Sequence, residues 1–131
     1  MAQENVELAH QAYDAFNRRD IDSYLETMAA DVEVFPRQAA MEGVYRGHAG
    51  IRHWWADLLD VFPDFTVEVI EVRDLGDMTL AALRFHGHGG DSESPFDEAV
   101  WQLAEVSDGK CVRWRTLTSE AEALEAVGLR E

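Results

Sequence analysis

The sequence has little cysteine, little positive charge and no long apolar run, and each shortage excludes a class of protein. Its one cysteine, Cys111, cannot form an internal disulfide, as expected in the reducing cytoplasm. Lysine and arginine total 11 against 26 aspartates and glutamates, which gives a formal net charge of −15 at pH 7. Nucleic-acid binding needs basic side chains, and an anionic membrane surface would repel this chain. We therefore expect neither nucleic acid nor membrane as a partner.

The sequence also shows no pattern typical of a membrane-spanning helix or of a signal peptide. No apolar stretch approaches the roughly 20 residues of a membrane-spanning helix. The beginning, MAQENVELAHQAYDAF, lacks the basic region and apolar run that define a signal peptide. The length of 131 residues and the hydrophobic share of 47% are those of an ordinary globular domain. We predict one domain over residues 1–131, located in the cytoplasm.

Apolar residues that recur every three or four positions predict helices in the first half of the chain. One helix is expected over 4–19, and a second begins after Asp20, whose side chain suits a helix N-cap. A short strand, DVEVFPR at 31–37, follows. The strongest helical pattern runs from residue 51 to 62, with its apolar face formed by Ile51, Trp54, Trp55, Leu58, Leu59 and Phe62.

After residue 65 the apolar period changes to two, which indicates strands. Four are predicted, at 65–75, 77–89, 96–106 and 109–117, and their short links carry turn residues. Successive strands with such links pair as an antiparallel meander. A final helix over 119–128 begins with a capping box, Ser119 with Glu122. The order predicts an α+β fold with helices packed on one face of a curved, mostly antiparallel sheet.

The segment EGVYRGHAGIRHWW, at 42–55, combines glycines, histidines and two tryptophans. A phosphate-binding loop needs lysine and serine or threonine after its last glycine, whereas Ile51 and Arg52 follow Gly50 here. His48 and His53 are five positions apart, so they do not share a helix face as zinc-binding pairs do. We interpret the segment as the entrance to a helix.

A second histidine pair, His86 and His88, lies on a predicted strand and allows two interpretations. The two side chains point the same way, as metal-binding histidines do. The strand phase places them opposite the apolar Leu83 and Phe85, which faces them outward with Arg84 unless a β-bulge reverses the phase. Asp91, Glu93 and Asp97 lie near the histidine pair in the sequence. On the last predicted strand the same alternation places Trp114 inward and Arg113 and Arg115 outward. We therefore expect the histidine pair to face outward.

Four segments carry a family resemblance: AYDAFNRRDID at 12–22, GVYRGHAGIRHWW at 43–55, FPDFTVEV at 62–69 and DGKCVRWR at 108–115. In these segments the chain resembles the SnoaL-like proteins of the nuclear transport factor 2-like superfamily. The resemblance implies a cone, in which the sheet wraps around the helices and leaves an apolar pocket. It also implies a homodimer through the outer sheet face. Members include polyketide cyclases, ketosteroid isomerase, dehydratases and limonene epoxide hydrolase as well as proteins without known activity, so the fold alone does not assign a reaction.

Enzymes of this family place an acid or base in the pocket, where burial tunes its pKa. Ketosteroid isomerase has an aspartate on the first strand, where this sequence offers Val34 or Phe35. We therefore expect Glu98 as the first choice of general acid or base, with Asp97 as the alternative and Tyr13 as hydrogen-bond donor. No cofactor and no metal are expected.

The predicted function is binding of a small apolar or polycyclic molecule, with cofactor-free acid/base catalysis of the cyclase, isomerase or hydratase type as one form of it. The alternative is a non-catalytic ligand-binding or protein-interaction module. The pocket is predicted to be lined by Tyr13, Phe16, Tyr24, Met28, Phe35, Trp54, Trp55, Leu58, Leu83, Phe85, Trp101 and Trp114.

Overall fold

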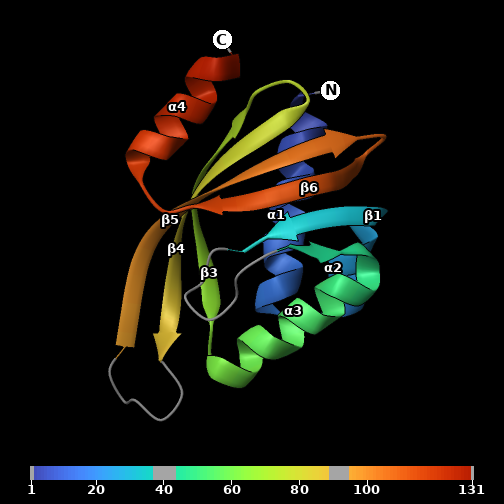
Figure 1. Ribbon diagram of the computed structural model, residues 1–131, viewed down its shortest axis with the longest axis vertical. Helices are drawn as coiled ribbons and strands as arrows, with labels where there is room; N and C mark the ends of the chain where they lie inside the picture. Colours follow the sequence, from blue (N-terminus) through green and yellow to red (C-terminus); the bar gives the residue numbers. More distant parts are fainter. Residues whose placement is uncertain (1, 37–43, 89–94, 131) are drawn as a thin grey trace.

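The computed structural model describes residues 2–36, 44–88 and 95–130. Within these residues the chain forms four helices and one curved sheet of six strands (Figure 1). In chain order the elements are α1 (Ala2–Asn17), α2 (Ile21–Glu26), β1 (Met28–Phe35), β2 (Tyr45–Arg46), α3 (Gly47–Val61), β3 (Thr66–Asp74), β4 (Met78–His88), β5 (Pro95–Ser107), β6 (Lys110–Leu117) and α4 (Glu120–Arg130).

The strands lie in the order β2-β1-β6-β5-β4-β3. The strands β3 to β6 pair as the predicted antiparallel meander. Two features were not predicted: β1 joins the sheet parallel to β6, and the two-residue β2 pairs with β1. Parallel pairing joins residues distant in sequence, so no local pattern marks it.

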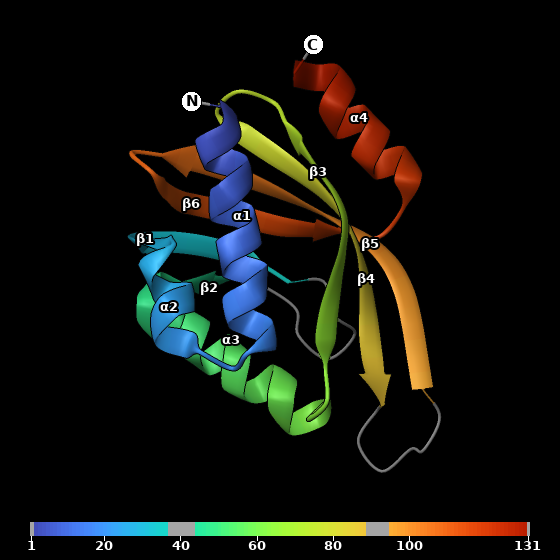
Figure 2. The same cartoon turned by 180° about the vertical axis from the view of Figure 1, so that it is seen from behind.

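Helices α1, α2 and α3 cover the concave face of the sheet (Figure 2). The α2 cap is confirmed, because Ser23 N donates a 3.1 Å hydrogen bond to Asp20 Oδ1. At the end of α1, Asn17 binds the backbone of β3 twice. Its Nδ2 donates to Val67 O (2.7 Å), and Val67 N donates to Asn17 Oδ1 (2.9 Å). This side chain therefore fixes α1 against the edge strand.

The predicted helix entrance is confirmed for the part of the segment that lies within the described residues. Helix α3 begins at Gly47, whose φ of +69° favours glycine. A Cβ on Gly50 would lie 3.0 Å from the carbonyl carbon of Tyr45, so this close approach also needs glycine. His48 Nε2 lies 3.0 Å from Met28 O, which joins the helix start to β1. Gly43 lies outside the described residues.

Helix α4 lies on the convex face, opposite α1 (Figures 1 and 2). The expectation that the helices share one face is therefore wrong for α4. The cause is a second, smaller apolar cluster on the convex side, where Ala123 packs with Leu80, Leu103 and Leu117. The predicted cap of α4 is present, because Glu122 N donates to Ser119 Oγ (3.1 Å).

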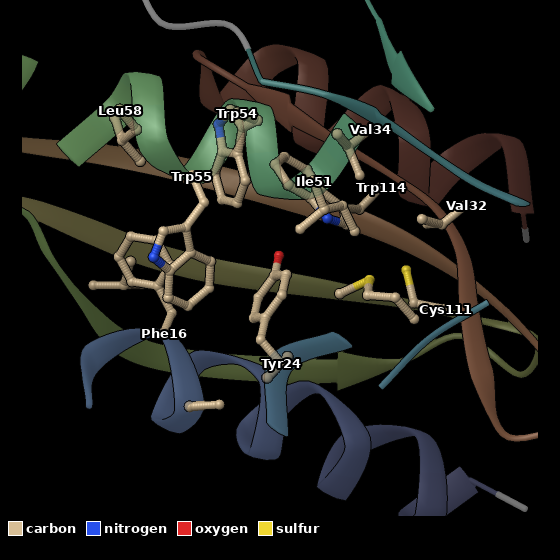
Figure 3. Close-up of a cluster of buried hydrophobic side chains, with 14 of the residues drawn as sticks. Phe16, Tyr24, Val32, Val34, Ile51, Trp54, Trp55, Leu58, Cys111 and Trp114 are labelled. Atoms are coloured by element: carbon tan, nitrogen blue, oxygen red, sulfur yellow. The ribbon is translucent and has the colours of Figure 1, made fainter. Parts of the chain in front are cut away.

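Aromatic rings fill much of the space between the sheet and the three helices of the concave face (Figure 3). The centroids of Phe16 and Trp55 are 4.9 Å apart, and those of Trp54 and Trp114 are 5.2 Å apart. Ile51 and Leu58 are fully buried beside them. The interior is thus a packed aromatic core rather than an open cone.

Candidate ligand-binding chamber

A cavity of about 30 Å³ lies between α1 and the sheet. Its lining residues on the first turns of α1, Asn5, Leu8 and Ala9, are half-buried, and we take this end of the cavity as its mouth. We call this cavity the chamber. A water molecule needs about 10–15 Å³ of such volume, so the chamber as it stands has room for one or two waters. It is lined by Asn5, Leu8, Ala9, Ala12, Tyr13, Tyr24, Thr27, Met28, Thr79, Gln102, Ala104, Val106, Cys111 and Trp114.

A chain of polar side chains crosses the chamber wall from α1 to β6. Tyr13 Oη donates to Gln102 Oε1 (2.8 Å), and Gln102 Nε2 donates to Thr116 Oγ1 (3.2 Å). At the mouth, Asn5 Nδ2 donates to Gly76 O (2.8 Å) in the turn between β3 and β4. These bonds hold α1 against β5 and the β3–β4 turn and fix the direction of the Tyr13 hydroxyl.

The ionisable groups of the chamber are neutral at physiological pH. Burial, with a smaller contribution from Cys111, raises the pKa of Tyr13 far above its ordinary value. Burial likewise raises the pKa of Tyr24 well above the ordinary tyrosine value. The pKa of the Cys111 thiol is raised to about 12, mainly by burial. The tyrosines therefore act as hydrogen-bond donors and acceptors, not as bases.

The predicted lining residues separate into three groups. Those that line the chamber are Tyr13, Tyr24, Met28 and Trp114. Those that pack in the core beside it are Phe16, Trp54, Trp55, Leu58, Leu83 and Phe85.

The third group requires a correction, because Phe35 and Trp101 lie on the convex face. Phe35 pairs with the exposed Arg115, while its neighbour Val34 is the buried residue. Trp101 packs with the cluster under α4. Side chains alternate along a strand, so the inward positions beside these two belong to Val34 and Val100.

The structure does not bring the predicted catalytic residues together. Glu98 pairs with Phe85 and shares its inward phase, but its side chain is exposed. Four positions along β5 separate it from Gln102, the partner of Tyr13, which corresponds to about 13 Å. Asp97 lies on the convex face, where Arg84 Nε donates to it (2.7 Å) and lowers its pKa.

The outward interpretation of the histidine pair is confirmed. Leu83 and Phe85 are buried, whereas His86 Nε2 lies 2.9 Å from Glu68 Oε1 at the surface. His88 Nδ1 lies 2.5 Å from Asp64 Oδ2, and this contact lowers the pKa of Asp64. Among the described residues, no group of three or more histidine, cysteine, aspartate or glutamate side chains is placed to hold a metal ion. Asp91 and Glu93 lie outside the described residues.

Sequence analysis missed several lining residues, among them Gln102 and Cys111. A signal for Gln102 exists in the strand pattern: it occupies the inward phase of β5 between Val100 and Ala104. A polar residue at an inward position needs a partner inside. The position of Cys111 carries no such signal, because a bulge between Glu105 and Val106 shifts the register of β6.

A second hollow, of about 300 Å³, lies on the convex face beside α4. We call it the outer groove. Its floor is apolar, and Leu124 on its rim is 59% exposed. The lining residues are Glu71, Arg73, Leu80, Ala82, Trp101, Glu120, Ala123 and Leu124.

Helices packed against a curved six-stranded sheet of this strand order form the nuclear transport factor 2-like fold. The SnoaL-like domain model matches residues 9–114, and the chain therefore belongs to the SnoaL-like family. The predicted family and fold class are confirmed. Among curated proteins, none matches this sequence. Within the described residues, no helix is long and apolar enough to cross a membrane.

Solved structures share the fold at low sequence identity. TerC, co-crystallised with polyporic acid, is 22% identical with a TM-score of 0.81, over 95% of this chain and 98% of TerC. A candidate SnoaL-like polyketide cyclase from Jannaschia sp. CCS1 is 20% identical, with a TM-score of 0.78 over 96% and 92% of the two chains. IdmH, a candidate polyketide cyclase from Streptomyces antibioticus, is 22% identical, with a TM-score of 0.76 over 94% and 97%.

Proposed function

We propose that this protein binds a small, largely apolar molecule, such as a polycyclic ketide or terpenoid, in the chamber beneath α1. The observation that carries the proposal is the composition of the chamber wall: apolar side chains enclose a few polar groups that stay neutral. Binding sites for small molecules have this composition. TerC, which shares the fold, was co-crystallised with a small molecule, polyporic acid, and this supports small-molecule binding.

A guest larger than one or two waters needs more room than the cavity of about 30 Å³ provides. We place the opening at the first turns of α1, because Asn5, Leu8 and Ala9 form the mouth. An exposed hydrogen bond, from Asn5 to Gly76, links this end of the helix to the β3–β4 turn. Exposed bonds at helix ends open at low cost, so the helix can admit a guest without unfolding the core.

The test is a titration with steroid, polyketide and terpenoid probes, followed by tryptophan emission. Trp114 lines the chamber, so a bound probe should change the emission with micromolar affinity. The variant Ala9→Phe fills the mouth with a larger side chain. It should weaken binding by about tenfold or more, because the probe can no longer enter the chamber. Ala56→Phe, on the exposed side of α3, is the matched control and should leave binding unchanged. Equal effects of the two variants, or no binding, would contradict the proposal.

The proposed role is binding without turnover in the chamber. Acid/base catalysis requires a group that exchanges a proton near working pH. Among the described residues that line the chamber, none is an aspartate, a glutamate or a histidine. Chromatography of each probe mixture tests this point, and we expect no product. A product that disappears in Glu98→Gln would instead support catalysis by the predicted acid/base residue.

The outer groove favours a second role, contact with another copy of the chain across the convex face. Its apolar floor and the 59% exposed Leu124 are features of interaction surfaces. Light scattering should give the mass of two chains for the natural sequence and of one for Leu124→Glu. Val61→Glu, which adds the same charge to an exposed residue of α3, should stay dimeric. A monomeric natural protein would refute this role.

A further inference from the structure

Helix α1 is held to the rest of the molecule unevenly along its length. Its buried residues, Ala12, Ala15 and Phe16, all lie in the second half of the helix. The side chains at positions 4–11 are half-buried or exposed. A segment with few buried apolar contacts opens at a lower free energy than one anchored in the core. The first half of α1 is therefore the weaker part, and it is the part that forms the mouth of the chamber.

Two side chains fasten the second half of α1 at its end. Asn17 exchanges two hydrogen bonds with the backbone of Val67 in β3. Arg19, which follows the helix, donates from Nη2 to Phe65 O (2.6 Å) in the segment between α3 and β3. Its guanidinium carbon also lies 5.3 Å from the centre of the Phe16 ring. These contacts join the end of α1 to the edge strand and to the aromatic core.

The first half of α1 meets the rest of the molecule at the turn between β3 and β4 (Figure 2). Asn5 Nδ2 donates to Gly76 O (2.8 Å), and this hydrogen bond is exposed. The turn is ordered by Asp74, whose Oδ1 accepts from Gly76 N (2.9 Å). An exposed hydrogen bond contributes little to stability, because water can replace either partner. The contact can therefore break and re-form while the second half of α1 stays in place.

We propose that residues 2–9 form a lid over the chamber, which opens by breaking the contact between Asn5 and Gly76. This inference rests on the proposed function and adds how its site is regulated: the opening of the lid sets the rate at which a guest enters and leaves. Tyr13 marks the boundary between the lid and the anchored half, because its bond to Gln102 ties the helix to β5. The lid contact closes an empty chamber and a filled one alike.

Hydrogen exchange of backbone amides tests the lid without any ligand. The amides at 7–10 bond to carbonyls within the lid, and those at 15–18 bond to carbonyls of the anchored half. We expect the protection at 7–10 to be at least about 100-fold lower than at 15–18. Asn5→Ala should lower the protection at 7–10 by about two- to tenfold more and leave 15–18 unchanged. Alanine is the better helix former, so this loss cannot come from weaker helix propensity. Equal protection of both halves would refute the lid.

Stopped-flow fluorescence tests whether the lid controls entry. The probe is N-phenyl-1-naphthylamine, a neutral apolar dye that gains emission in apolar surroundings. In Asn5→Ala both association and release of the dye should be about two- to tenfold faster, because the lid is open more often. The dissociation constant should change by less than about twofold, because the lost bond affects the empty and the filled chamber equally. Gln11→Ala, which truncates an exposed amide side chain of the same helix beyond the lid, is the matched control and should leave both rates unchanged.

The outcomes separate the lid from the proposed function. If the dye binds and Asn5→Ala changes neither rate, or Gln11→Ala changes both as much, the lid is refuted while the chamber stands. If Asn5→Ala weakens binding without changing the two rates together, Asn5 is a contact of the ligand and the lid is refuted as well. If the dye does not bind the natural protein, the proposed function fails, and the control of entry fails with it.

Discussion

On the concave face of the sheet, rings from α1, α2, α3, β4 and β6 pack in a buried cluster, whereas the convex face carries ion pairs such as Arg84–Asp97 and Arg113–Glu33. Arg113 illustrates the convex side, because it donates to Glu33 (2.8 Å) and Glu105 (3.2 Å) across neighbouring strands. Both faces belong to the same strands, and alternate side chains of one strand supply them. Stability on the concave face comes from apolar burial, while exposed ion pairs contribute little.

The comparison also explains why the chamber, rather than the ion pairs, is the better candidate site. Groups on the convex face exchange partners with water at small cost. Polar groups in the chamber wall are shielded from water and bind a neighbour instead, as Tyr13 binds Gln102. An apolar wall with a few fixed polar groups is the composition typical of small-molecule sites.

The largest expected difference between the faces is one of packing. Ile51→Ala should lower the free energy of unfolding by about 2–5 kcal/mol, because Ile51 is fully buried and leaves a cavity. Ile70→Ala makes the same chemical change at a residue that is 55% exposed and should cost less than about 1 kcal/mol. Urea denaturation of both variants measures the contrast. Similar losses in the two variants would mean that apolar burial does not stabilise the concave face more than the exposed one.

The buried tyrosines predict alkaline unfolding driven by the concave face. The pKa values of Tyr13 and Tyr24 are raised in the folded protein, mainly by burial, so the folded state keeps these protons longer than the unfolded state. The contribution of these two tyrosines to the free energy of unfolding is complete below the ordinary tyrosine pKa of about 10. Above that pH it decreases by about 1.4 kcal/mol per pH unit for each tyrosine.

Tyrosinate absorbance and circular dichroism, followed together from pH 9 to 12, test this expectation. Both buried tyrosines should ionise only as the protein unfolds. The variant Tyr13→Phe should make the decline of stability above pH 10 less steep. Ionisation of both groups in the folded protein would show that the chamber is open to water.

Asn17 connects the concave helices to the sheet edge, and its removal should have an intermediate effect. Asn17→Ala deprives both Val67 N and Val67 O of their partner, which should cost about 1–3 kcal/mol. Asn17→Asp keeps the acceptor for Val67 N and loses the donor, so a smaller loss is expected. Urea denaturation gives the values, and hydrogen exchange at Val67 shows where the effect lies. Unchanged exchange in Asn17→Ala would contradict this assignment.

The smallest effect is expected from the ion pairs of the convex face. Hydrogen bonds from Arg113 and Arg46 lower the pKa of Glu33. The carboxylate therefore stabilises the fold above the ordinary glutamate pKa, and this contribution disappears as pH falls through the lowered value. Arg113→Met should lower the urea midpoint of unfolding slightly at pH 7. The loss should be smaller at pH 3.5, and also smaller at pH 7 in 1 M salt. A deficit that persists at low pH and high salt would indicate a packing role for the Arg113 stem.

Much of the fold could be predicted from local pattern. The 51–62 helix and the four-strand meander were found because one buried stripe or face leaves a regular period in sequence. The outward phase of His86 and Arg84 followed from Leu83 and Phe85 by the same rule. The parallel pairing of β1 with β6 and the convex position of α4 were missed. Each joins elements that no local period connects.

The candidate site was predicted only in part, for a similar reason. Tyr13, Tyr24, Met28 and Trp114 were among the expected lining residues, but Phe35 and Trp101 were expected inside and lie outside. Aromatic character marks a residue as suited to burial without saying which face of the sheet it serves. Glu98 and Tyr13 were expected to cooperate, and the strand register separates them.

What the sequence by itself determined is the class of fold, the family and the phase of β4, since apolar period, capping residues and turn residues act over a few positions. What only the tertiary structure decided is which side chains meet in the chamber: Tyr24 from α2, Trp114 from β6 and Gln102 from β5. Their meeting depends on a register that includes a bulge and a parallel strand pair, and register is set by the sum of long-range packing rather than by any one segment.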